Sequence, residues 1–466
     1  MTKEYRSFYY DEMQKEPITD DFTLPAGTEM TPELLVRLIE EHKESRVPRY
    51  LRLKAAYEGK YLIFDKDRNR KPDYKPDNRL GAPLAQYLCD TFTGYFIGEP
   101  ASVRHASASQ GKWLADFEAD NEQEDKNAEL AEESSKYGHC FEYLFQNEHG
   151  APESTVLTPI ATFLVKDDTV RHRPMYGVRY SYDENGGLQG EFMDASSVTA
   201  FSNDNGEILF DDPEPHVFGG VPLIEYVENK EKRGVFEGVL NLIEAYNKVL
   251  SEKANDVDYF ADAYLVVEGA ELPDDFKQDL REYRLINAFN NNGAPCKVYF
   301  LQKPDSDGTQ ENLIDRLEML IFKTAMIPDI SDESFGTASG IALKMRLLPM
   351  SNLAKKKERK FKSAMMRRYR LLANYPNKPF DDWRGVEIVF HRNMPEDLAS
   401  EAALAGSLSG IVSEETQLSV LSCVDDPKEE MARKEAELDK MADAMAGAFP
   451  TNRTNQEEID HVEDEG

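Results

Sequence analysis

The sequence predicts an α+β protein that is mostly helical, and three observations support this. Three long segments carry apolar residues near helical spacing, at residues 236–264, 309–327 and 341–374. Shorter segments between residues 140 and 180 are rich in aromatic and β-branched residues, which is typical of strands. The chain has 466 residues, of which 40% are hydrophobic, so it can build about two to four domains with buried cores.

Residues 1–30 are expected to form a flexible arm, because they are polar and contain two prolines and a glycine. Residues 31–233 are expected to form an α+β domain with an antiparallel sheet. Its first helix should begin after Thr31, which is a good N-cap, because Pro32 suits the first helical position. This helix should end near Glu44.

Further helices and strands are predicted within this domain. Helices are expected at Leu84–Phe96 and around Asn127–Lys136, and strands at 140–145, 162–165 and 175–180. Asn203-Asp-Asn-Gly206 predicts a turn.

Residues 234–330 are predicted to form two helices on either side of a small insert. The first helix lies within 234–264 and should have about 28 residues, a length of roughly 40 Å at 1.5 Å per residue. The insert, 265–308, is expected to contain a strand at 265–267, a short helix at Pro273–Glu282 and a strand at 297–301. The second helix, within 309–330, should be capped by Thr309 and stopped by Pro328.

A polar loop at 331–340 leads to a third long helix over 341–374. Pro349 removes a backbone hydrogen bond inside this helix and predicts a kink. A strand at 386–390 should return the chain to the sheet domain, so that 341–393 form one region. Residues 394–450 are predicted to be helical, at 395–408, 414–421 and 427–448, and 451–466 to form an acidic disordered tail.

Charge is distributed unevenly along the chain. The net charge is −32, yet residues 341–370 contain eleven lysines and arginines and the single acid Glu358. This segregation predicts that the basic helix meets acidic surface, in its own chain or in a neighbour. A solvated basic face and a general nucleic-acid patch are the alternatives.

Common catalytic and metal-binding signatures are missing from the sequence. It contains neither a GxxxxGK[ST] phosphate loop nor an HExxH zinc site, and Gly406-Ser-Leu-Ser-Gly410 has leucine where a nucleophile elbow needs serine. Asp329, Asp332 and Glu333 could in principle hold a metal, but a charged loop surface explains them better. Catalysis, cofactors and metals are therefore not expected.

Other sequence features bear on the cellular compartment. The four cysteines lie far apart and form no CxxC pair. Apolar runs are too short for a membrane span, and the first residues lack the pattern of a secretory signal. We therefore expect a chain made in a reducing cytoplasm.

Several segments together resemble the portal proteins of long-tailed, double-stranded DNA bacteriophages. They lie in matching order over roughly residues 45–440, and their joint order is more specific than any one of them. The segments are Gly94-Tyr-Phe-Ile-Gly-Glu-Pro100, Phe236–Lys248, Asn255–Leu265, Gly336-Thr-Ala-Ser-Gly-Ile-Ala-Leu-Lys344, Asn352–Phe361 and Gly410-Ile-Val-Ser-Glu-Glu-Thr416.

The resemblance implies a portal fold that assembles into a ring, expected to be a dodecamer. Residues 31–233 would be the wing, 234–264 and 309–330 the stem, 265–308 the clip and 394–450 the crown. Residues 331–340 would be the tunnel loop, with the DNA-facing residues Asp332, Glu333, Ser334, Phe335, Gly336, Thr337 and Ser339. The basic helix would pair with neighbouring subunits through Lys344, Arg346, Lys355, Lys356, Lys357, Arg359 and Lys360.

The same resemblance implies a non-catalytic channel at one capsid vertex of the virion, through which DNA is packaged and later ejected. Its partners would be the terminase large subunit, head-completion or adaptor proteins, the major capsid and scaffolding proteins, and double-stranded DNA bound without sequence specificity. No membrane partner is implied. The alternatives are a DNA-processing enzyme and a cytosolic scaffold protein, and the first of these would need a metal or nucleotide site.

Overall fold

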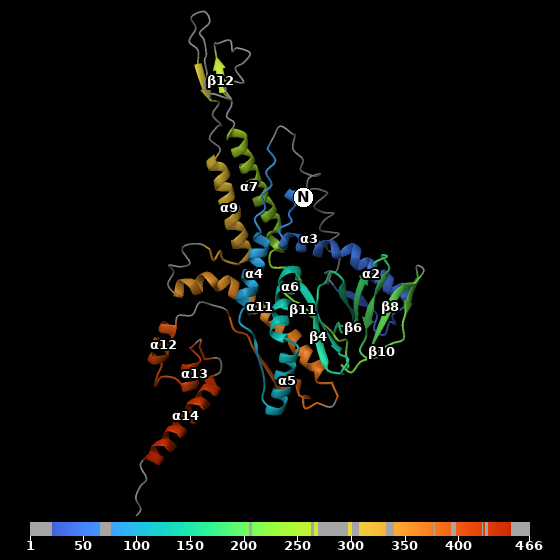
Figure 1. The fold of residues 1–466 in the computed structure, drawn as a ribbon, viewed down its shortest axis with the longest axis vertical. Coiled ribbons are helices and arrows are strands. Elements are labelled where there is room, and N and C mark those ends of the chain that lie inside the picture. The colour runs from blue at the N-terminus through green and yellow to red at the C-terminus, as the bar shows by residue number, and fades with distance from the viewer. Residues whose placement is uncertain are drawn as a thin grey trace, which may run out of the picture. The chain divides into compact units, whose positions relative to one another are not determined.

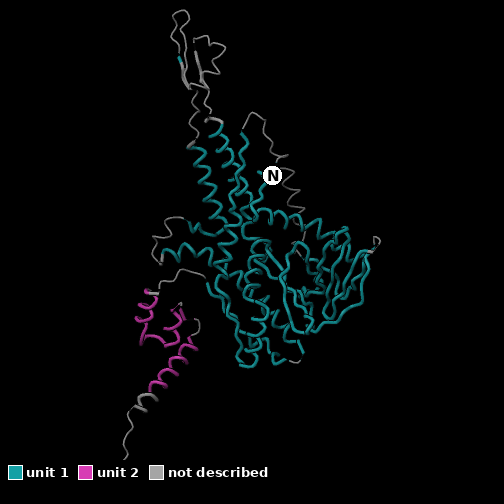
Figure 2. The backbone as a smooth tube through the Cα atoms, in the orientation of Figure 1, with its two compact units in different colours: residues 1–393 teal, residues 394–466 magenta. Residues whose placement is uncertain are grey.

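We analysed a computed structural model of the chain, which forms two compact units, residues 1–393 and 394–466 (Figure 2). The structure describes residues 21–65, 76–204, 207–261, 265–268, 297–300, 307–331, 340–376, 378–392, 398–421, 423–424 and 427–448. The predicted short helix at 273–282, the acidic tail and most of the N-terminal arm lie outside these residues.

The larger sheet of the first unit is mixed, whereas we expected an antiparallel one. Its strand order is β1-β5-β6-β7-β8-β10, with β9 also paired to β8, and the β1–β5 pair is parallel. The strands are β1 (Phe22–Leu24), β5 (Thr162–Asp167), β6 (Pro174–Tyr182), β7 (Leu188–Met193), β8 (Ser197–Asp204), β9 (Glu207–Phe210) and β10 (Glu214–Pro215).

Strand β1 corrects the expectation of a flexible arm up to residue 30. Phe22 pairs with Val165 of β5, and the side chains of Phe22 and Leu24 are buried. Alternation along this short strand directs both side chains into the core. The chain is therefore ordered before the first helix starts.

Helix α2 (Pro32–Ser45) covers one part of this sheet, and its start confirms the prediction at Thr31. The Thr31 hydroxyl accepts a hydrogen bond from the Leu34 N–H at 3.3 Å. Leu35, Leu38 and Ile39 recur at helical spacing and pack in one core with aromatic and aliphatic side chains of the strands.

A second sheet has the order β11-β3-β4 and is antiparallel. Its strands are β3 (His139–Gln146), β4 (Pro152–Leu157) and β11 (Leu223–Val227). Alternation along β3 sends Phe141 and Tyr143 into a core shared with the larger sheet. Helices α6 (Gln123–Tyr137) and α11 (Gly340–Leu372) also pack on this sheet. Most of β3 is therefore buried on both faces.

The remaining helices of this part are α3 (Val47–Tyr57), η1 (Leu62–Phe64), α4 (Leu84–Ile97), α5 (Ala108–Asp120) and α6 (Gln123–Tyr137). The prediction of α4 is confirmed, whereas α5 was not predicted and α6 is longer than expected. The strand expected at 386–390 forms as β14 (Val386–Val389) after η3 (Trp383–Gly385). It returns the chain to the sheet domain as predicted, and it pairs there with β2 (Ser102–His105) in a separate two-stranded sheet.

Helices α7 (Leu240–Ala261) and α9 (Asp307–Ala325) lie side by side (Figure 1). A 3₁₀ turn, η2 (Glu237–Val239), precedes α7, so the helix starts later than residue 234 and has 22 residues. Thr309 lies inside α9 and is not its cap. The two predicted strands of the insert are confirmed as an antiparallel pair, β12 (Leu265–Glu268) with β13 (Lys297–Phe300).

Helix α11 (Gly340–Leu372) has 33 residues and continues through Pro349. The second unit contains α12 (Leu398–Ser407), α13 (Glu414–Leu418) and α14 (Pro427–Ala448). Helices α12 and α13 end before their predicted last residues, 408 and 421. Helix α13 is capped by the Ser413 hydroxyl, which accepts from the Thr416 N–H at 3.3 Å.

Candidate functional site

Helix α11 contains most of the predicted site residues and has two distinct faces. One face is buried in the first unit and consists of residues three or four positions apart: Leu347, Met350, Ala354, Lys357, Phe361, Ala364, Met365, Arg368 and Leu372. Two cations, Lys357 and Arg368, belong to this otherwise largely apolar row, and neither side chain is exposed.

The partners of the Lys357 ammonium, one carboxylate and two hydrogen-bond acceptors, all belong to its own chain. Its Nζ lies 2.6 Å from Glu228 Oε2, and it donates to the Ser135 hydroxyl and the Ala131 carbonyl, both at 2.7 Å. Burial raises the pKa of Glu228, and the Lys357 ammonium opposes this effect. The pair joins α11 to α6 and to the segment after β11.

Arg368 forms a second buried pair, about three helix turns further along. Its Nε donates to both Glu142 oxygens at 2.7 and 2.8 Å, and a terminal nitrogen donates to Asn127 Oδ1 at 2.8 Å. Glu142 also accepts hydrogen bonds from Tyr226 and Gln123. Such pairs are specific in geometry, and a buried charge left without its partner is costly.

These contacts correct the sequence-based expectation for Lys357. Because this lysine is buried against Glu228, it is not available to a neighbouring subunit. The other six predicted cations of the helix are exposed in the isolated chain: Lys344, Arg346, Lys355, Lys356, Arg359 and Lys360. The three- and four-residue spacing of the apolar row was a usable signal, since Lys357 falls on it and its neighbours Lys355 and Lys356 do not.

The predicted tunnel-loop residues Asp332, Glu333, Ser334, Phe335, Gly336, Thr337 and Ser339 lie outside the described residues. Asp329, just before them, accepts from the Ser331 hydroxyl at 2.6 Å and from the Tyr87 hydroxyl at 3.3 Å. The DNA-facing role of this loop therefore stays a prediction.

A polar row on α7 was missed by the sequence analysis. Asn247, Ser251 and Asn255 accept hydrogen bonds from backbone N–H groups within residues 78–82, at 2.8, 2.9 and 2.6 Å. Four helical residues rise about 6 Å, and two extended residues span roughly 6.6 Å, so helix and extended chain stay in register. The four-residue repeat of small polar residues was the available signal.

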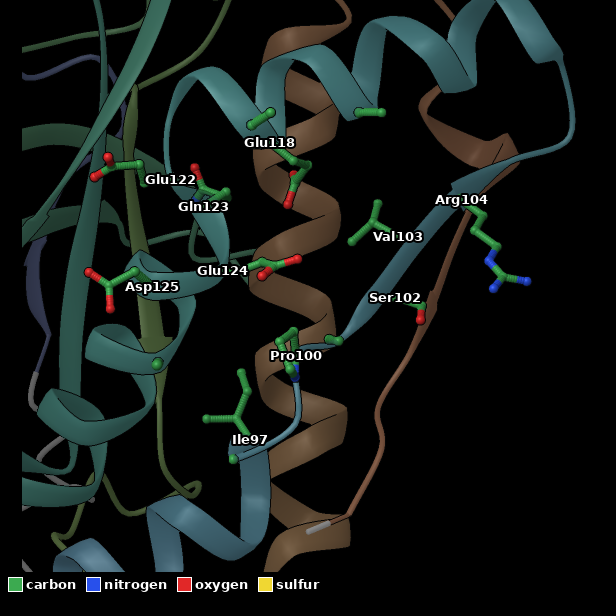
Figure 3. A pocket seen from close by; sticks show the side chains of 15 residues that line it. Ile97, Pro100, Ser102, Val103, Arg104, Glu118, Glu122, Gln123, Glu124 and Asp125 are labelled. Carbon is green, nitrogen blue, oxygen red and sulfur yellow. The ribbon is translucent and has the colours of Figure 1, made fainter. Parts of the chain in front are cut away.

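A groove of about 1060 Å³ lies between the end of α4, strand β2 and helices α5 and α6. Its lining contains the acids Glu118, Glu122, Glu124 and Asp125, and the single arginine Arg104. Figure 3 shows Glu118 and Glu124 directed towards the strand that carries Val103. Burial raises the pKa of Glu118, with Arg368 opposing the shift. The groove thus combines apolar and acidic side chains in its lining.

A third charged cluster lies beside β1. Lys232 pairs with Asp21 and Glu225, and His139 Nδ1 lies 2.8 Å from Glu225 Oε1. Burial would raise the pKa of Glu225, but Lys232, His139 and Lys166 hold it well below its usual value. His139 thus belongs to a buried group of charged side chains next to β1.

The described residues contain neither a cluster of metal ligands nor a candidate membrane span. No three histidine, cysteine or acidic side chains gather there as a metal ligand set would require. In that same part of the chain, no helix is both long and apolar enough to cross a bilayer.

The order of elements can now be compared with known proteins. The family model described as phage portal protein, SPP1 Gp6-like, matches residues 37–443. The chain belongs to the phage portal protein family. This confirms the family and the fold class expected from the sequence, and as a member the chain is a structural protein and not an enzyme.

Individual relatives are distant in sequence. The portal protein of Bacillus phage SPP1 is 23% identical over 401 residues, which cover 80% of this chain and 78% of that protein. The portal protein of Clostridium phage phiCD119 is 22% identical over 217 residues, covering 46% and 48%. A solved structure of the neck of an empty GTA particle, computed with C6 symmetry, aligns with a TM-score of 0.45 at 11% identity, over 73% of this chain and 90% of that one.

Proposed function

We propose that this chain is the subunit of a ring that surrounds the DNA path at one vertex of a phage capsid. Double-stranded DNA enters the capsid through the ring during packaging and leaves through it into the tail. The observation that carries this proposal is the portal-family match over residues 37–443.

Properties of the described residues support an assembly of many copies. The paired helices α7 and α9 expose the apolar side chains of Val257, Leu313 and Met319, which a neighbouring copy would cover. A head-to-tail contact between two different surfaces closes into a ring when its rotation fits. The net charge of −32 favours a wall that repels phosphate and lets DNA slide.

Each region of the chain corresponds to one part of the proposed ring. Residues 31–233 are the wing, α7 and α9 the stem, 265–308 the clip and 394–450 the crown. Residues 331–340 form the tunnel loop at the DNA, followed by the basic helix at the subunit boundary. The clip contacts the terminase large subunit during packaging and head-completion proteins afterwards, while capsid and scaffolding proteins hold the ring in the virion shell.

The assembly is tested by electron microscopy of the purified full-length chain, with class averages examined for rotational symmetry. Rings with a central channel and about twelve-fold symmetry are expected from the family. A chain that stays monomeric over a wide range of concentration and salt would contradict the proposal.

The tunnel loop is tested separately, by shortening residues 333–338. Packaging of DNA in phage-infected cells should fall, while the yield of rings stays unchanged. Normal packaging by the shortened chain would refute the loop's assignment without affecting the ring.

A further inference from the structure

The outer face of α11 has the features of a contact surface. Met345 is 68% exposed and Leu348 is 50% exposed, and both lie on the face opposite the buried row. The same face continues with the exposed cations Lys355, Lys356 and Arg359, at spacings of three, four and seven residues. We call these five residues the outer stripe of α11.

Met345 and Leu348 form an exposed apolar pair that precedes the three cations, and such a pair is unusual on the surface of an isolated chain. Large exposed apolar side chains next to one another mark surfaces that another molecule covers. The chain's own interior is not that partner, because the buried row on the opposite face already joins α11 to the sheet and to α6.

The groove described above is complementary to this stripe. Its lining includes the apolar side chains of Ile97 and Val103 and the exposed acids Glu122, Glu124 and Asp125. None of the residues that line the groove belongs to α11. A volume of about 1060 Å³ accommodates several side chains of a helix, since pockets for whole small ligands measure roughly 300–1,000 Å³.

We infer that the outer stripe of α11 docks into the acidic groove of the adjacent copy of this chain. The inference rests on the proposed ring and names its contact. A ring needs a head-to-tail interface made of two different surfaces on each subunit, and the stripe and the groove are two such surfaces. Met345 and Leu348 would contact the apolar side chains of the lining, and the cations would face its exposed acids.

Charge reversal on each side tests the contact. One variant is Lys355→Glu with Lys356→Glu, and the other is Glu124→Lys with Asp125→Lys. Each should weaken the association of subunits about tenfold or more, because like charges then oppose each other in the interface. Combining all four substitutions should restore most ring formation, measured by analytical ultracentrifugation and negative-stain microscopy.

A matched control reverses two exposed cations elsewhere on the first unit, Arg171→Glu with Lys230→Glu. This variant changes the net charge by the same amount as the α11 variant and should leave the ring yield unchanged. Thermal unfolding of every variant checks that the fold is kept, since all six positions are exposed.

Cysteine cross-linking gives a second readout that does not depend on ring yield. Chains with Lys356→Cys are assembled together with chains carrying Asp125→Cys, both with the native cysteines replaced by serine. A short bis-maleimide should then produce covalent dimers in the mixture and none in either chain alone.

The outcomes separate the inference from the proposed function. If the wild-type chain forms no rings, the proposed function fails. If the wild type forms rings and the reversed variants assemble as well as the control, the docking inference is overturned, whereas the proposed function is retained. It is also overturned if the fourfold variant shows no recovery or if the mixed cysteine chains give no dimer.

Discussion

Replacing Lys357 with methionine should destabilise the folded chain by about 3–5 kcal/mol, the usual result of leaving one member of a buried ion pair alone. The side chain is fully buried, and Glu228, its partner at 2.6 Å, is 6% exposed. Methionine retains most of the apolar volume, so the loss of packing should be small. Among the side-chain contacts described for Glu228, a Ser135 hydroxyl at 3.4 Å would remain.

The loss should depend on pH, because Glu228 can escape the penalty by taking up a proton. Burial already raises its pKa, and removing the ammonium of Lys357 raises it further. A carboxyl whose pKa is higher in the folded state than in the unfolded state binds more protons when folded. The variant therefore gains stability as the pH falls, and its deficit against the wild type should shrink from pH 8 to pH 5.

Urea denaturation of dilute subunits, followed by circular dichroism, measures the free energy of unfolding. The double variant Lys357→Met with Glu228→Gln should recover much of the loss, since no charge is then left alone. Lys356→Met, at the exposed neighbouring position, should change stability by less than about 0.5 kcal/mol. A loss below about 1 kcal/mol for Lys357→Met, or no recovery in the double variant, would refute this reasoning.

Two further buried groups, Glu142 and His42, and the half-buried Lys378 each give a prediction. Glu142→Gln should lower the free energy of unfolding by about 3–5 kcal/mol, because Arg368 loses its counter-charge. A double-mutant cycle between Glu142 and Arg368 should show strong coupling, and additive losses would contradict this. Burial lowers the pKa of His42 to about 3, so the stability of the wild type should fall as the pH drops from about 6.5 towards 3. An equally steep fall in the stability of His42→Gln would argue against a role of His42. Burial lowers the pKa of Lys378 to about 7, so Lys378→Met should raise the midpoint temperature of unfolding at pH 7. This gain should fade towards pH 10, and a gain independent of pH would count against this account.

Local signals explain the parts of the fold that were predicted well. The cap at Thr31 and the proline after it act within one helical turn, so the start of α2 could be predicted from the residues themselves. The strands β12 and β13 are similar cases, since their composition is that of strands. The long apolar periodicities likewise predicted α7, α9 and α11, with errors of a few residues at their ends.

Elements that depend on distant partners were predicted poorly. Strand β1 has three residues and exists because Phe22 finds Val165 on β5, far along the chain. Helix α5 has only Leu114 and Phe117 as buried residues, too few for a clear period. Strand β14 was predicted, but its pairing with β2 was not, because pairing is decided by the arrangement of both segments in space.

The sequence by itself determined the family, the helical segments and the concentration of positive charge between residues 341 and 370. It did not determine which cations of that segment reach the surface. Only the tertiary structure placed Lys357 and Arg368 inside the first unit and left Lys355 and Lys356 outside. The physical reason is that helix formation depends on neighbours a few residues away. A buried charge, in contrast, is tolerated only where the fold supplies a carboxylate, and here Glu228 and Glu142 come from distant parts of the chain.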